Sequence, residues 1–264
     1  MKRITLYIFF IFSCLFIFSQ ETVAFMRQAK SWILGYQSEH SLYQSNALEC
    51  VELHVEAVLG DIFIQGWSLP SVAIEVIKEG VSQTVGDIQL DYKATPERCE
   101  IITRPNESAH IASVSYRIMV PRKARVTART AKGLIQAEDL HGGVSFVSED
   151  GAVTAVSIAG SIFMQASGKV VVSLLSGGSV SEIEINSRRS TVTLCTNGPV
   201  NAELFASCIY GPINVQQPVL LLPQQTPLNR QTWDYLQRNV RARMGVGGSR
   251  FQIFAHEEII ISLS

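Results

Sequence analysis

The chain has 264 residues, of which 47% are hydrophobic and 17% are charged, and its formal net charge at pH 7 is −1. This length allows one large all-β domain or two ordinary domains. A near-neutral charge gives no reason to expect nucleic acid as a partner. The low charged fraction, together with many Val, Ile, Ser and Thr residues, argues against disorder and favours β-strands.

The first segment carries the pattern of an export signal. Lys2 and Arg3 precede an apolar run, Ile4–Ser19, which is shorter than the ~20 residues of a comfortable membrane span. Two small residues, Thr22 and Ala24, then precede a cleavage site after Ala24. The sequence therefore predicts a signal peptide that ends at Ala24.

Removal of residues 1–24 would leave a mature chain in the periplasm, in the outer envelope or secreted. An uncleaved segment would instead anchor the chain in the inner membrane through residues 4–19. An even number of cysteines lies beyond this segment, and in an oxidising compartment four cysteines permit two disulfides. The alternative is free, half-buried thiols at these positions, which are Cys50, Cys99, Cys195 and Cys208.

Two segments carry apolar residues at helical spacing and are candidate end caps. The first lies in residues 25–49, which we assign to a linker or an N-terminal cap. The second is residues 230–244, which would form a helical insert. For both segments an ordinary loop is the alternative to a short helix. The apolar residues at this spacing are Ala29, Trp32, Ile33 and Tyr36 in the first segment and Trp233, Leu236, Val240 and Met244 in the second.

Between these segments a glycine recurs at intervals of eight or nine residues. The second and fourth residues after each glycine are apolar, and the residues between them are mostly polar, which is the period of a strand with one buried face. Glycine suits each corner because a tight turn often needs a positive φ. The glycines are Gly133, Gly142, Gly151, Gly160, Gly168 and Gly177.

The complete repeat is about 18 residues, because the fourth residue after the glycine alternates in size. Ala137, Ala155 and Val172 are small, whereas Phe146 and Met164 are large. This alternation predicts a coil of two strands, with small side chains on one wall and large ones on the facing wall. We therefore expect an all-β fold, a single-chain parallel β-solenoid (β-helix) over residues 50–264, in which each coil packs on its neighbours.

Three segments resemble the bacterial adhesin-like β-strand-repeat family: GDIFIQGW, YRIMVP and AKGLIQAEDLHGGVSFVSEDGAV. The resemblance covers roughly residues 50–264. It implies an extracytoplasmic parallel β-solenoid without established catalytic residues, and it specifies the fold better than the role.

Motifs for catalysis and cofactor binding are absent from the sequence, which has no G-x-S-x-G, no P-loop lysine and no histidine pair at metal spacing. We therefore expect no catalytic residues, no cofactor and no metal site. The best pair for acid/base chemistry is Glu182 and Glu184, whose Cα atoms would lie about 7 Å apart on one strand face. Ile183 and Ile185 compete for the interior. A one-residue bulge after the Gly177–Gly178 pair would turn the two glutamates to solvent.

A run of basic residues is the most distinct charged feature. The range Arg117–Lys132 contains six basic residues and no acidic one. Strand alternation turns Lys123, Arg125 and Arg129 to solvent together. This stripe predicts contact with an anionic glycan, a lipid head group or an acidic envelope protein. The alternative is a solvated strand face that resists edge pairing.

The sequence thus predicts an exported, non-enzymatic, adhesin-like binding or scaffold module of the cell envelope or surface. The alternative is a carbohydrate-active β-helix enzyme that acts on an anionic polysaccharide. A groove lined by three or more stacked acidic and basic side chains would favour the enzyme.

Overall fold

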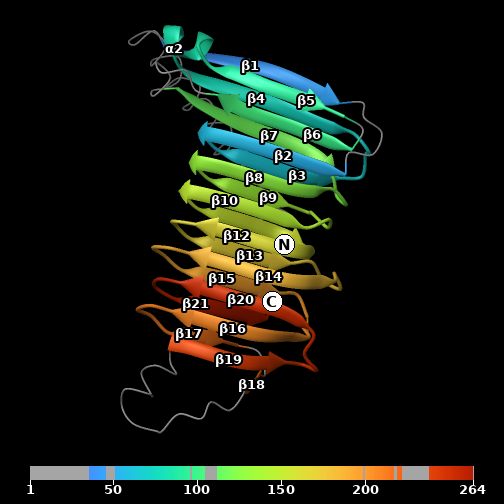
Figure 1. The fold of residues 1–264 in the computed structure, drawn as a ribbon, viewed down its shortest axis with the longest axis vertical. Coiled ribbons are helices and arrows are strands. Elements are labelled where there is room, and N and C mark those ends of the chain that lie inside the picture. The colour runs from blue at the N-terminus through green and yellow to red at the C-terminus, as the bar shows by residue number, and fades with distance from the viewer. Residues whose placement is uncertain are drawn as a thin grey trace, which may run out of the picture.

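The computed structural model describes residues 36–45, 51–95, 97–104, 112–198, 200–216, 219–221 and 238–263. The described residues form two large, mostly parallel sheets that stand side by side as a column, together with the short helix α2 (Ser82–Gly86) (Figure 1). No helix in this part of the chain is long and apolar enough to cross a membrane. The predicted signal peptide, residues 1–24, lies outside the described residues.

The two sheets contain nearly all of the regular structure. In spatial order, sheet A consists of β1 (Tyr36–Ser45), β4 (Val72–Val81), β7 (Ser113–Pro121), β3 (Ile62–Trp67), β9 (Ile135–Glu138), β11 (Val153–Ile158), β13 (Val170–Leu174), β15 (Val192–Thr196), β21 (Ile259–Leu263) and β17 (Ile213–Val215). Sheet B consists of β18 (Val219–Leu221), β19 (Asn239–Met244), β16 (Ala202–Cys208), β20 (Ser249–Ala255), β14 (Val180–Ser187), β12 (Gly160–Ala166), β10 (Val144–Asp150), β8 (Arg125–Lys132), β2 (Glu52–Leu59), β6 (Arg98–Arg104) and β5 (Gln89–Ala94).

In the middle of the column the chain alternates between the sheets, with even-numbered strands from β8 to β14 in sheet B and odd-numbered strands from β9 to β15 in sheet A. The strand registers there confirm the predicted two-strand repeat. Val144 pairs with Val126 on one side and with Ile162 on the other, and each partner lies one whole repeat away in the sequence. The same offset separates Val153 from its partner Ile135 in sheet A.

The sorting of side chains by size is also confirmed. Phe146 and Met164 are fully buried neighbours in sheet B, and Ala128 fills the next place in that stack. Large residues there oppose small ones in sheet A, so the interior between the sheets stays filled. The small residues stacked in sheet A are Ala137, Ala155 and Val172.

At one corner of the coils, glycines stack so closely that a side chain would not fit. A Cβ on Gly151 would lie 2.0 Å from the carbonyl oxygen of Gly133, and a Cβ on Gly133 would lie 2.0 Å from that of Gly60. Buried hydroxyls donate to the same carbonyls, from Ser148 to Gly133 at 2.7 Å and from Thr130 to Gly60 at 3.2 Å. At Gly151, close approach of the backbone rather than a positive φ requires glycine.

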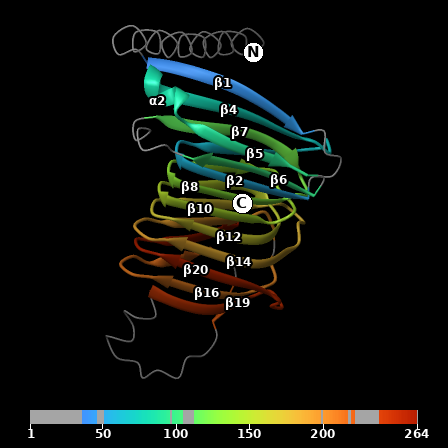
Figure 2. The ribbon, with the colours of Figure 1, turned by 45° about the horizontal axis from the view of Figure 1, so that its top comes forward.

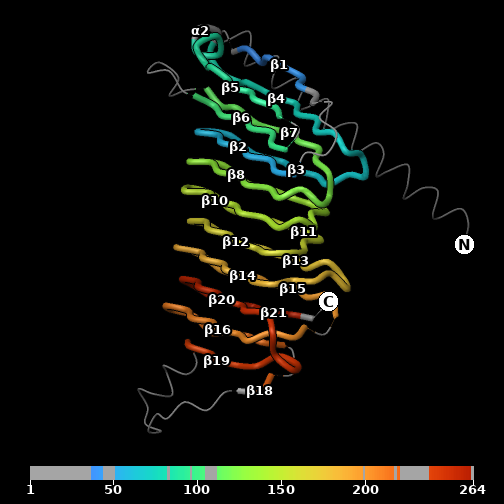
Figure 3. Tube along the Cα trace, turned by 45° about the vertical axis from the view of Figure 1, so that its right-hand side comes forward, coloured from blue at the N-terminus to red at the C-terminus, as the bar shows by residue number. Residues whose placement is uncertain are grey.

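Both ends of the column depart from the order of the sequence. β20 lies between β14 and β16, and β21 lies between β15 and β17 (Figure 3). At the other end β2 lies between β8 and β6, and β3 lies between β9 and β7. Antiparallel strands lie at three of the four described sheet ends: β4 and β1 in sheet A, and β5, β19 and β18 in sheet B. Figure 2 shows β1, β4 and β5 at one end of the column and β19 at the other, whereas sheet A ends there on the parallel strand β17.

The structure describes only part of residues 25–49 and 230–244, and there Tyr36–Ser45 and Asn239–Met244 are strands, where the apolar spacing had suggested helices. The other residues on which that prediction rested lie outside the described residues, and they are Ala29, Trp32, Ile33, Trp233 and Leu236. The apolar spacing does not distinguish the two structures, because Val240 and Met244 are at positions i and i+4, which lie on one face of a strand as well as of a helix. Along β19, Ala242 and Met244 are buried, as the period of two requires. The edge of β16 supplies backbone partners that only a strand can use.

Candidate functional surface

A row of cross-strand neighbours on the solvent-facing side of sheet B alternates in charge. We call this side outer face B and the row the charged row. The pairing of neighbouring strands places each charged residue of the row beside the next. Gly143 and Ser161 occupy the middle of the row, because they directly precede the paired residues Val144 and Ile162. From β6 to β19, the nine members are Arg98, Glu52, Arg125, Gly143, Ser161, Glu182, Arg250, Glu203 and Arg243.

The members of the charged row differ in how they are paired. Arg243 Nη2 lies 3.8 Å from Glu203 Oε1, next to it in the row. Within the described residues, no ion pair involves Arg125, Glu182 or Arg250, although all three are exposed. The middle of the row therefore presents charges that are free to meet a partner.

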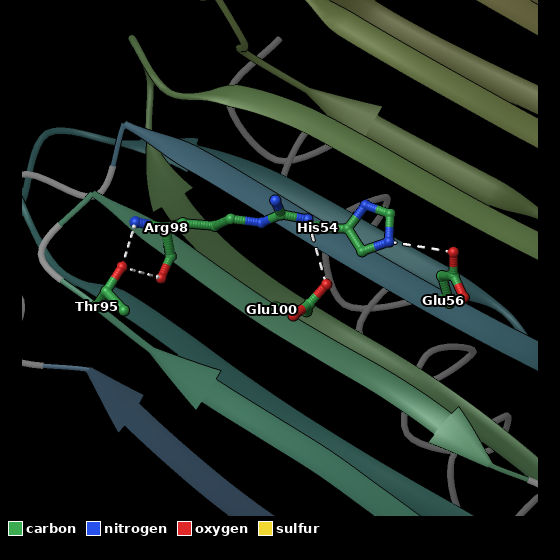
Figure 4. A network of polar contacts seen from close by, with 5 residues as sticks. All are labelled: His54, Glu56, Thr95, Arg98 and Glu100. Atoms are coloured by element: carbon green, nitrogen blue, oxygen red, sulfur yellow. Dashed lines mark hydrogen bonds and ion pairs between the residues drawn. The ribbon is translucent and has the colours of Figure 1, made fainter.

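A polar network fixes the side chains at the start of the row (Figure 4). Arg98 Nη2 lies 3.2 Å from Glu100 Oε1, and His54 Nε2 lies 3.1 Å from Glu56 Oε1. Thr95 Oγ1 donates to the Arg98 carbonyl at 3.1 Å and accepts from the Arg98 N–H at 3.0 Å. Exposed pairs of this kind add little to stability. Their effect here is to hold charged groups of β2 and β6 in fixed positions on outer face B.

Two residues of the predicted basic stripe, Arg125 and Arg129, stand on outer face B, and Lys123 is exposed in the turn before β8. Arg129 Nη2 lies 2.5 Å from Glu149 Oε1, and this hydrogen bond raises the pKa of the Arg129 guanidinium. The strand register also places a glutamate of β2 beside each arginine of β8, namely Glu52 beside Arg125 and Glu56 beside Arg129. The stripe is thus interleaved with acidic side chains that are distant in the sequence.

The bulge expected in β14 is present. The register slips by one residue between the pair Gly160 and Val180 and the pair Ile162 and Ile183. Ile185, two residues further on, is fully buried like Ile183. Consequently Glu182 and Glu184 face solvent, as the sequence predicted.

A hollow of about 260 Å³ lies in the middle of outer face B. Gly143, Ser145 and Ser161 line it with little side-chain volume, and the half-buried ring of Phe163 stands beside them. Charged side chains line it from β8 and from β14, and these are Arg125, Glu182 and Glu184. Two acidic groups and one basic group therefore line a single depression.

A second hollow, of about 460 Å³, lies on the outer side of sheet A over β1, β4, β7, β3 and β9. Leu42 and Met119 line it and are 83% and 42% exposed, and Phe63 adds an aromatic ring. An ion pair crosses it, since Arg117 Nη1 lies 3.6 Å from Glu75 Oε2. Sequence reasoning missed this groove, because the antiparallel pairing of β1 with β4 that builds it has no local signature.

Two of the described cysteines form no disulfide, and the described residues hold no metal site. Cys195 and Cys208 carry free thiols, and Ser262 Oγ donates to Cys195 Sγ at 3.4 Å. Cys99 is buried on β6, and Cys50 lies outside the described residues, so its pairing stays a prediction. Among the described residues, no group of three or more His, Cys, Asp or Glu side chains could hold a metal ion.

Comparison with known proteins finds likeness in structure alone. No family model and no curated protein matches the chain. Among solved structures, a putative cell adhesion protein from Clostridium sporogenes aligns with a TM-score of 0.48 and 12% identity over 87% of this chain and 100% of that chain. A putative adhesin from Bacteroides fragilis gives 0.34 and 11% over 86% and 97%, and one from Parabacteroides merdae gives 0.29 and 8% over 86% and 96%. Likeness of this strength assigns the chain to no family.

Proposed function

We propose that the chain is an exported β-solenoid that serves as an adhesin-like binding or scaffold module of the cell envelope. The observation that carries this proposal is the alternation of the chain between two parallel sheets, with the same sequence offset from β8 to β10, from β10 to β12 and from β9 to β11. Such a column is rigid and presents its outward side chains in straight rows, about 4.8 Å apart from strand to strand. Straight rows suit recognition of an extended surface better than enclosure of a small substrate.

An envelope protein fits outer face B better than a polyanion does. On β6, β2 and β8 three outward arginines stand among three outward glutamates, and the fourth arginine, Arg104 of β6, lies 2.5 Å from Asp91 Oδ2 of β5, so these formal charges cancel. A polyanion gains little from a balanced face, whereas a protein surface of mixed charge can match it group by group. The residues in question are Arg98, Arg125 and Arg129, and Glu52, Glu56 and Glu100.

Export and the protein partner are tested in the producing cell. Analysis of the N-terminus of the exported chain should find Phe25 as the first residue, and recovery of the full chain from the cytoplasm would refute export. A photoreactive side chain placed at Thr127, which faces outward on β8, should crosslink to an envelope protein. The same group at Thr154, which faces outward on sheet A, is the matched control and should give no such crosslink.

An anionic glycan or lipid head group is a second ligand class, favoured by the exposure of Lys123 and by the absence of an ion pair at Arg125 within the described residues. Replacement of Lys123, Arg125 and Arg129 by Gln should then abolish retention on heparin or anionic vesicles at low salt. The melting curve should stay nearly unchanged, because exposed charges contribute little to folding. Equal retention of the variant and the wild type would rule this ligand class out.

A carbohydrate-active enzyme is the second candidate function, and the hollow lined by Arg125, Glu182 and Glu184 favours it. A carboxylate pair can supply an acid and a base, and the arginine can hold an anionic sugar. Incubation with anionic polysaccharides should then release oligosaccharides, and Glu182→Gln or Glu184→Gln should reduce that release at least 100-fold. Release that the two substitutions leave unchanged, or no release from any polysaccharide, would dismiss this candidate.

A further inference from the structure

Along eight of the nine members of the charged row, from Arg98 of β6 to Glu203 of β16, the order of charges is complementary to its own reverse. Reading from β6, the first three members are positive, negative and positive: Arg98, Glu52 and Arg125. Reading backward from β16, the corresponding three are negative, positive and negative: Glu203, Arg250 and Glu182. The two places between these triplets hold small, uncharged residues, Gly143 and Ser161, and the ninth member, Arg243, faces β5 of the second copy instead of a member of the row. A row of this kind can pair with a second copy of itself.

We propose that outer face B is the interface of a symmetric homodimer, with a two-fold axis that runs parallel to the strands and passes between β10 and β12. Rotation about this axis turns the second copy to face the first and reverses the order of its strands. Positions along the strand direction do not change, so the charged row of one copy lies opposite the charged row of the other. Arg125 then faces Glu182 of the second copy, Glu52 faces Arg250, and Arg98 faces Glu203. Each of these contacts occurs twice, so six pairs of opposite charge form from one row.

The rows beside the charged row tolerate the same arrangement. In the next row Thr127 faces Glu184 of the second copy and His54 faces Gln252, and these groups can form hydrogen bonds. Glu100, which already pairs with Arg98 of its own chain, faces Phe205. In the row after that, Arg129 faces Asn186, and Glu56, which lies beside His54 of its own chain, faces Phe254. Two like charges meet at the rim, Lys93 and Arg241, where solvent ions screen them.

Shape and size favour the same dimer. A twisted sheet is a saddle, and a half-turn about a strand direction superposes a saddle on its own shape, so the two faces stay parallel along the column. From β6 to β16 the face spans eight strands with three outward residues on each, or roughly 40 Å by 20 Å, which is about 800 Å² from each copy and typical of a stable interface.

The hollow at the proposed axis has a matching knob. Phe163 lies in the row beside the charged row, next to Ser145, which lines the same hollow. Because the axis passes between β10 and β12, Phe163 of the second copy faces Ser145. Its ring thus reaches the space that the small side chains of Gly143, Ser145 and Ser161 leave open. An aromatic ring seated in a pocket at the centre of an interface is a common energetic hot spot.

Charge reversal tests this dimer, with sedimentation equilibrium of the full chain as the measurement. The wild type should be a dimer at about 100 µM and should dissociate as salt is raised. Arg125→Glu and Glu182→Arg should each raise the dissociation constant at least tenfold, because each sets like charges face to face twice. The double variant should return it to within about threefold of the wild type, since the opposite signs face each other again.

Lys169→Glu is the matched control, because it reverses an exposed charge at a corner away from outer face B and should change nothing. Phe163→Asp should also dissociate the dimer, which tests the knob without the charged row. A wild type that stays monomeric would overturn the proposal. So would a double variant that dimerises as weakly as the single variants although its melting temperature equals that of the wild type. If the dimer forms, the crosslink from Thr127 goes to a second copy of this chain, so a crosslink from Thr127 to a different protein would also contradict the dimer. The N-terminal test of export is independent of both results.

Discussion

Substitution of Gly151 by Ala should destabilise the fold by about 3 kcal/mol or more. The new Cβ would lie 2.0 Å from the carbonyl oxygen of Gly133 and 2.6 Å from Ser148 Oγ, so backbone would have to move by more than about 1 Å to restore an ordinary contact of about 3.2 Å. Overpacking of this kind costs about 1–3 kcal/mol. The movement would also strain two corner hydrogen bonds, from Ser148 Oγ to Gly133 at 2.7 Å and from the Gly168 N–H to Gly151 at 2.7 Å, each contributing about 1 kcal/mol.

Gly86→Ala is the matched control, because a Cβ at Gly86 has no heavy atom within 4 Å. There the substitution should be neutral or should stabilise by up to about 1 kcal/mol, since alanine loses less backbone entropy on folding. Gly168→Ala should fall between the two, because its nearest contact would be 2.8 Å. Urea unfolding followed by circular dichroism measures all three free energies of unfolding. If Gly151→Ala lay within about 0.5 kcal/mol of Gly86→Ala, which is the usual range of surface substitutions, the stacked corner described above would be wrong.

Two further predictions concern the interior. Phe146→Ala should cost about 3–5 kcal/mol because it empties a fully buried stack, whereas Thr154→Ala on the outer side of sheet A should stay within about 0.5 kcal/mol of the wild type. If denaturant unfolding showed Thr154→Ala to be less stable than Phe146→Ala, the strand register described above would be wrong. Burial raises the pKa of Tyr116, whose hydroxyl bonds the Thr103 hydroxyl, so the folded state keeps a proton that the unfolded state loses above about pH 10. The free energy of unfolding should therefore fall as pH rises beyond about 10. Tyr116→Phe should remove this alkaline decrease and should cost about 1–3 kcal/mol at neutral pH. If the decrease were unchanged in the variant, Tyr116 would not be its source.

The central coils were predictable from the sequence because their signals are local. A glycine, two apolar residues at spacing two, and a size alternation that recurs with every second glycine define the register from Val126 to Ile162, and the structure has that register. The bulge that turns Glu182 outward was predictable for the same reason, since Ile183 and Ile185 had to stay inside.

The ends and the surface were not predictable, because they depend on which distant strands become neighbours. The apolar spacing of Val240 and Met244 fits a helix and a strand equally, and the edge of β16 decided the outcome. Likewise, the sequence shows Arg125 in a purely basic run, and the parallel pairing of β2 with β8 brings Glu52 beside it from a distant part of the chain. Charge complementarity on a sheet is a property of register, and a single sequence gives no register between strands so far apart.

The strand order also determines where the molecule can change its length. From β8 to β15, strands that follow one another in the chain also follow one another in each sheet, so duplication or deletion of one two-strand coil there would lengthen or shorten the column by one rung, about 4.8 Å. At the two ends, β2, β3, β20 and β21 lie between strands from other parts of the chain, and an insertion there would separate pairs that must meet. We infer that related chains should differ in length by whole coils within residues 125–196 and should keep both ends constant, which makes the column an adjustable spacer between two fixed termini.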